Sequence, residues 1–71
     1  MDLSKVQLGQ AYIVSGVNTN DRELNDFLFS LGCYSGAPIA VISRRPGGCI
    51  VAIKDGRYNI DKRLARAITV A

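Results

Sequence analysis

The sequence predicts a single small domain, mainly β, in which about five strands form a barrel and one short helix separates strands one and two. Its 71 residues suffice for one hydrophobic core and no more. Hydrophobic residues make up 48% of the chain, enough apolar surface to offset the conformational entropy lost on folding. Short apolar segments rich in β-branched residues alternate with glycine-containing turns, which is typical of a small β domain. We therefore treat residues 1–71 as one domain.

The first half of the chain predicts a strand followed by a helix. Residues 11–17 are rich in β-branched and aromatic side chains and favour a strand. We expect Asn20 to be the helix N-cap, with Glu23 three residues later completing a capping box. Gly32 is placed to end the helix in a left-handed conformation.

One face of this helix is apolar, with hydrophobic residues spaced at i, i+3, i+4 and i+7. The stripe consists of Leu24, Phe27, Leu28 and Leu31. A helix of about eleven residues does not persist alone in water, so the stripe must pack on the strands. We expect Phe27 to lie at the centre of that packing.

The second half of the chain predicts four strands joined by tight turns. We expect the strands at Ile39 to Arg45, Cys49 to Ile53, Arg57 to Ile60 and Ile68 to Val70. Pro46-Gly47-Gly48 and Asp55-Gly56 supply the turns between the first three, and Asp61 caps a single helical turn before the last. Closure into a barrel removes the exposed edges that an open sheet would offer. The fold prediction is an SH3-like barrel.

The sequence predicts a protein that stays in the cytosol. Its apolar runs are far shorter than the roughly 18 to 20 residues that cross a bilayer, and its first residues do not resemble a secretory signal. We therefore expect no membrane insertion. Cys33 and Cys49 should then be reduced and partly buried, because the cytosol keeps thiols reduced.

The residue types argue against catalysis and against a resident metal or cofactor. The chain has no histidine, which is the commonest metal ligand and general base. Cys33 and Cys49 lack the close spacing of a structural zinc site. The acidic residues near the helix start are better explained by the helix macrodipole than by metal binding. We therefore expect no enzyme activity and no tight iron or zinc site.

A basic surface is the strongest remaining signal. Residues 1–31 carry two basic and four acidic side chains, whereas residues 32–71 carry seven basic and two acidic ones. The candidate patch consists of Arg44, Arg45, Lys54 and Arg57, with Tyr34 nearby. Surfaces that bind nucleic acid usually interleave aromatic residues among the basic ones, and few aromatic residues lie near this patch. The alternative to a binding patch is a solvated basic face, whose charges protect the strand ends and keep the protein soluble.

The segment from Leu31 to Gly48 resembles a known family pattern. It combines a helix-ending Leu-Gly, a glycine a few residues on, an Ile-x-Val strand, and a basic residue before a Pro-Gly turn. The resemblance continues backward through the helix and residues 8–14, and forward to the C-terminal strand. These features are similar to the family of ferrous iron transport protein A, whose members resemble the SH3-like C-terminal domain of iron-dependent repressors.

The resemblance implies a function and a partner. It implies a non-catalytic, cytosolic accessory protein of bacterial ferrous iron uptake that binds and modulates the transmembrane ferrous iron transport GTPase through the GTPase's cytosolic domain. Arg44, Arg45, Lys54, Arg57 and Tyr34 are the candidate contact residues, on a monomer or weak homodimer with no nucleic acid expected. The alternative is a small barrel that binds nucleic acid, or a free-standing regulatory domain of repressor type.

Overall fold

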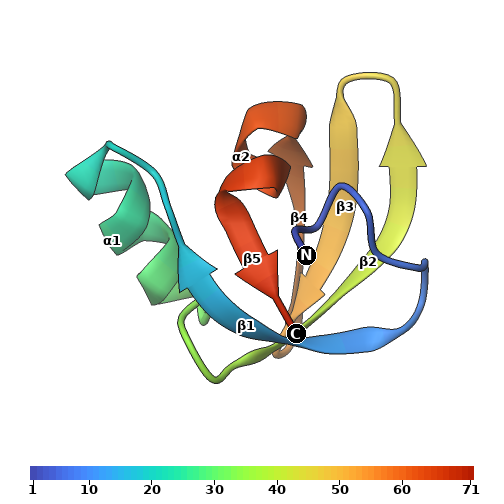
Figure 1. The fold of residues 1–71 in the computed structure, drawn as a ribbon, viewed down its shortest axis with the longest axis horizontal. Coiled ribbons are helices and arrows are strands. Elements are labelled where there is room, and N and C mark those ends of the chain that lie inside the picture. Colours follow the sequence, from blue (N-terminus) through green and yellow to red (C-terminus); the bar gives the residue numbers. More distant parts are fainter.

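The computed structural model describes residues 1–71 and contains five strands and two helices (Figure 1). In chain order they are β1 (Ala11–Val17), α1 (Arg22–Leu31), β2 (Pro38–Arg45), β3 (Gly48–Ile53), β4 (Gly56–Asp61), α2 (Lys62–Ala67) and β5 (Ile68–Val70). The prediction of a mainly β domain with a helix between strands one and two is confirmed. The sequence predicts only a single turn after Asp61, whereas the structure forms the six-residue helix α2 there. Neither helix has the length and apolar character needed to span a membrane.

The strands form one antiparallel sheet with the order β4-β3-β2-β1-β5. The sheet is not closed, which corrects the expectation of a fully closed barrel. Strand β1 changes partner along its length. Its residues 11–13 pair with β2, and its later residues pair with β5 across a bulge near Ser15. Helix α2 carries the chain from β4 to β5 and packs against both. The two edge strands are therefore joined by a helix rather than by hydrogen bonds to each other.

The N-terminal segment, residues 1–10, covers the edge at β5. Asp2 forms an isolated bridge with Thr69, and the Val70 N–H donates to Met1 O at 2.7 Å. The Leu3 N–H lies 3.2 Å from both Ala65 O and Ile68 O. The sequence predicts that barrel closure protects the sheet edges. At β5 the edge is instead covered by the first residues of the chain.

The core lies between the sheet, α2 and the N-terminal segment. Strand β3 is an interior strand between β2 and β4, in line with the expectation that it is not at an edge, and it contributes Cys49, Val51 and Ile53, each at most 2% exposed. Leu3 is fully buried and joins the same cluster. The buried residues of the cluster are Leu3, Val6, Val14, Leu28, Cys33, Ile39, Val41, Cys49, Val51, Ile53, Ile60, Ala65, Ile68 and Val70.

Helix α1 begins one residue later than the sequence predicts. Asp21 is the N-cap instead of Asn20, with extended backbone and a carboxylate that accepts from the Leu24 N–H at 3.2 Å. A charged acceptor at this position both caps a free N–H and complements the positive end of the helix. The predicted end is confirmed, since Gly32 is the C-cap at φ 100°.

The expectation that Phe27 lies at the centre of the core is wrong. Leu28 is 1% exposed and belongs to the core cluster, whereas Phe27 is 55% exposed. Figure 1 shows the reason, because α1 projects from the side of the sheet rather than lying flat across it. The edge of the stripe that contains Leu24 and Leu28 reaches the core, whereas on the other edge Leu31 is half-buried and Phe27 is exposed.

The two adjacent residues therefore give a matched test of how α1 packs. We predict that Leu28→Ala lowers the free energy of unfolding by about 2 to 5 kcal/mol, because it leaves a cavity in the core. Phe27→Ala should cost no more than about 1 kcal/mol, since the ring is largely solvated. Urea denaturation of both variants measures this directly. A larger loss for Phe27→Ala than for Leu28→Ala would contradict the observed orientation of α1.

Candidate functional site

The structure does not bring the predicted basic residues into one patch. Arg45 pairs with Gly48 at the β2–β3 turn, and Arg44 pairs with Cys49 beside it. Lys54 follows the other end of β3, in the turn to β4. Lys54 lies six positions after Gly48 along the strand, which corresponds to about 20 Å. The predicted residues thus form two groups at opposite ends of the β2–β3 hairpin, with Arg57 beside Lys54.

Tyr34 and Lys54 belong to the first group and lie next to Phe29. We call these three residues the Tyr34 corner. The Lys54 ammonium donates to the Tyr34 hydroxyl at 2.9 Å and lies 5.1 Å from the ring centroid. The Phe29 ring lies 5.0 Å from that of Tyr34, tilted by 40°. Sequence analysis singled out Tyr34 and Lys54 but not Phe29, which is 65% exposed.

Gly32 makes the Tyr34 corner sterically feasible. A Cβ at this position would lie 2.6 Å from Cε of Lys54, so the lysine stem occupies the space that any other residue would fill. Its φ of 100° is also a conformation that L side chains rarely adopt. The end of α1 and the β3–β4 turn are therefore held in contact through the Lys54 side chain.

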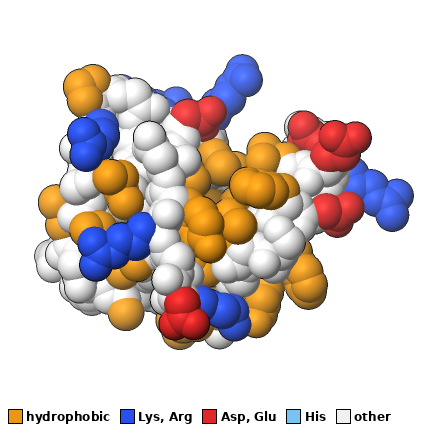
Figure 2. All heavy atoms as spheres, turned by 180° about the vertical axis from the view of Figure 1, so that it is seen from behind, with side chains coloured by type: hydrophobic (Ala, Val, Ile, Leu, Met, Phe, Trp, Pro, Cys, Tyr) orange, Lys and Arg blue, Asp and Glu red, His pale blue; other side chains and the backbone are white.

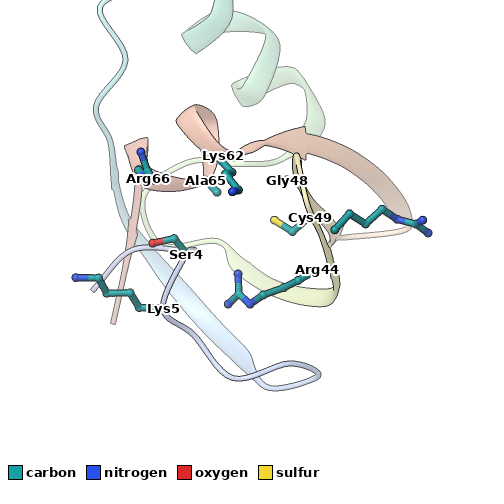
Figure 3. A pocket seen from close by; sticks show the side chains of 9 residues that line it. Ser4, Lys5, Arg44, Gly48, Cys49, Lys62, Ala65 and Arg66 are labelled. Carbon is teal, nitrogen blue, oxygen red and sulfur yellow. The ribbon is translucent and has the colours of Figure 1, made fainter.

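Arg44 and Arg45 belong to the second group, which lines a cleft of about 350 Å³. Its walls come from the N-terminal segment, the β2–β3 hairpin and α2 (Figure 3). We call it the basic cleft. It is lined by Ser4, Lys5, Arg44, Arg45, Gly48, Cys49, Lys62, Ala65 and Arg66. Five of these nine residues are basic and none is acidic.

Arg44 builds one wall of the basic cleft. Its guanidinium donates to Leu3 O at 3.1 Å and to Val6 O at 2.7 Å. The side chains of Leu3 and Val6 are buried in the core. The N-terminal segment is therefore held both by these buried side chains and by the hydrogen bonds from Arg44 to its backbone carbonyls. Arg44 is therefore a structural clamp, with two of its N–H groups bound to the N-terminal segment.

The floor of the cleft is tightly constructed. A Cβ on Gly48 would lie 2.0 Å from Ile60 O, so only glycine allows β3 and β4 to approach this closely here. The next residue, Cys49, lies beside the cleft and is 1% exposed. Figure 3 shows Arg44 and Lys62 on opposite sides with Cys49 between them.

Both cysteines are free thiols and are buried. Burial raises the pKa of the Cys33 thiol. Burial also raises the pKa of Cys49, although the neighbouring Arg44 charge opposes part of the rise. The structure groups no three Cys, Asp or Glu side chains in a way that could hold a metal ion, and the absence of a tight iron or zinc site stays a prediction.

Sequence analysis missed three residues of the basic cleft: Lys5, Lys62 and Arg66. A signal for two of them was available, because Lys62 and Arg66 are four residues apart and share one face of a helix. The spacing is informative only if residues 62–67 form a full helix, whereas the sequence predicts a single turn. Nothing local to Lys5 indicates that the N-terminal segment lies against α2.

Comparison with known proteins gives a family match over the whole chain. Residues 1–71 match the model of the FeoA domain. The chain belongs to the FeoA domain family. It is 30% identical to a crystal structure of an iron uptake regulatory protein (FeoA), covering 99% of this chain and 93% of that one with a TM-score of 0.84. Comparison with curated proteins gives no significant match.

More distant structural neighbours show how widely the fold occurs. FeoA of Stenotrophomonas maltophilia, crystallised with zinc and described as a prokaryotic SH3 domain protein, is 20% identical over 100% of this chain and 89% of its own, with a TM-score of 0.85. A manganese-dependent transcriptional repressor is 23% identical over 100% of this chain and 40% of its own, with a TM-score of 0.86. These likenesses confirm the SH3-like fold and its resemblance to a repressor domain.

The Arg44 clamp predicts a difference between two adjacent arginines. Arg44→Gln should lower the free energy of unfolding by about 1.5 to 3 kcal/mol, because it removes two charge-assisted hydrogen bonds. Amide hydrogen exchange at Leu3 and Val70 should accelerate in the same variant. Arg45→Gln serves as the control and should change stability by less than about 0.5 kcal/mol. Equal effects of the two substitutions would show that the clamp contributes nothing to stability.

The buried thiols predict a pH dependence of stability. In the unfolded chain they ionise near pH 9.0, whereas the folded protein holds its thiol protons to higher pH. The folded state thus binds more protons above pH 9, and the free energy of unfolding should fall as pH rises through that range. Urea unfolding at pH 7.5 and 10 measures the change. The Cys33→Ala/Cys49→Ala variant should show a smaller fall, and an equal fall would assign it to other groups.

Proposed function

We propose that this protein is a non-catalytic, cytosolic accessory component of bacterial ferrous iron uptake, and that it acts by binding the cytosolic domain of the transmembrane ferrous iron transport GTPase. The observation that carries the proposal is the match of the whole chain to the FeoA domain family. It is supported by the 30% identity to an iron uptake regulatory protein. A role through binding requires an accessible recognition surface on the protein.

The Tyr34 corner supplies the chemistry of such a surface. Exposed aromatic and basic side chains are enriched among the residues that dominate protein interfaces. The Phe29 and Tyr34 rings meet in a tilted arrangement, and the Lys54 ammonium donates to the Tyr34 hydroxyl, so part of the side-chain freedom is already lost before binding. Arg57 is exposed on β4 near the same turn. Figure 2 shows further hydrophobic side chains exposed around α1 on the rear face.

The charges at this surface suggest how the partner is approached. Lys54 and Arg57 present positive charge, which would attract an acidic face of the transporter's cytosolic domain and raise the rate of encounter. Arg45 adds a more distant positive charge, whereas Arg44 is already bound to the N-terminal segment. We therefore place the main electrostatic contribution at Lys54 and Arg57.

Surface plasmon resonance with the immobilised cytosolic domain tests the proposal at two ionic strengths. Lys54→Glu/Arg57→Glu should slow association about tenfold at low salt and weaken its salt dependence. Arg22→Glu/Arg63→Glu makes the same change in net charge at exposed positions on the two helices and should associate nearly as fast as the parent.

Three outcomes would count against the proposal in different ways. Equal slowing by both double variants would exclude the Tyr34 corner as the docking surface. Failure of the parent to bind the cytosolic domain at all would contradict the partner itself. Binding of the parent to single-stranded oligonucleotide with a steep salt dependence would favour the nucleic-acid alternative.

A further inference from the structure

We propose that the basic cleft is a binding site for a compact phosphate group carrying two or more negative charges. The first observation is the concentration of charge. Five of the nine basic residues of the chain line this one cleft, and no acidic residue does. Like charges gathered around one cleft repel one another, and an anion bound among them would relieve that repulsion.

The second observation is that the basic groups are available. Among the basic side chains, only Arg44 and Lys54 donate hydrogen bonds within the molecule. Lys5, Arg45, Lys62 and Arg66 therefore have all their donors free for a ligand. Arg44 donates two of its five N–H groups to the N-terminal segment. These bonds fix the Arg44 charge beside the cleft, and the remaining N–H groups are free to bind a ligand.

The third observation is the shape and lining of the cleft. Its volume of about 350 Å³ lies at the small end of the range for ligand pockets, which favours a compact group. No aromatic side chain lines it, so a nucleobase would find no stacking partner there. Lys62 and Arg66 lie one helical turn apart on α2 and both line the cleft. Figure 3 shows Lys62 near the centre of the cleft, whereas the Arg66 guanidinium and the Lys5 ammonium lie at its rim. Phosphate oxygens between Lys62 and Arg44 would accept from both, and Arg66, whose side chain makes no hydrogen bond within the molecule, is free to turn toward them.

Two sources supply this chemistry, namely a soluble phosphate compound and the phosphate of an anionic lipid headgroup. The inference is independent of the proposed function, because it rests on the basic cleft and not on the Tyr34 corner. Its test needs no transporter protein. The two proposals can therefore fail separately.

Isothermal titration calorimetry of the full-length protein with pyrophosphate, at constant ionic strength set with potassium chloride, tests the soluble source. We expect one saturable site. Arg66→Gln and Lys62→Gln should each weaken it by about tenfold, because each removes a charged donor. Arg63→Gln is the matched control, since it lies between them on α2, makes the same charge change and does not line the cleft. Thermal melting of each variant confirms that it is folded.

A second arm tests the lipid source. Co-sedimentation with phosphatidylcholine vesicles, with and without phosphatidylglycerol, measures binding to the headgroup phosphate. Binding to the anionic vesicles that is lost in Arg66→Gln and kept in Arg63→Gln supports the proposal with a lipid as ligand. Absence of saturable binding in both arms overturns it. Equal weakening by Arg63→Gln and Arg66→Gln also overturns it, because the attraction would then come from net charge and not from the cleft.

Discussion

The two hydrogen bonds from the Arg44 guanidinium to Leu3 O and Val6 O hold the N-terminal segment against the sheet. The same segment is bonded to β5 through Met1 and Asp2, so it spans from β5 to β2, the two neighbours of β1. An open five-stranded sheet in a chain of this size has few other means to cover its edge and complete its core. Fully buried Leu3 and the near wall of the basic cleft both depend on this arrangement.

Local chemistry made most of the elements predictable. Gly32 ends α1 where a left-handed residue is needed, and the β2–β3 and β3–β4 hairpins form where turn residues interrupt apolar runs. The orientation of α1 was not predictable, because an apolar stripe shows which residues avoid water but not how flat the helix lies on the sheet. The stripe therefore includes both Leu28, which is buried, and Phe27, which is not.

The candidate site was harder to predict than the fold because it is built by contacts distant in sequence. Basic residues on neighbouring strands suggest one patch, yet Arg44 and Arg45 lie at one end of the β2–β3 hairpin and Lys54 lies at the other. A register shift between Val41 and Ser43 also changes the alternation along β2 just before Arg44. Arg44 then donates to the carbonyls of Leu3 and Val6, which lie about forty positions earlier in the sequence. Lys5 reaches the cleft only because the N-terminal segment docks there. No local pattern encodes either contact.

The Tyr34 corner and the basic cleft share the β2–β3 hairpin but occupy its opposite ends. The roughly 20 Å between them is about twice the screening length of 0.1 M salt, so charge at one end has little effect on binding at the other. Strand β3 connects the two ends, and its alternate residues Cys49, Val51 and Ile53 are at most 2% exposed. Binding at the two ends should therefore be nearly additive. On both proposals together, the domain holds an anion at one end while a protein partner occupies the other, which makes it an adaptor and not a switch.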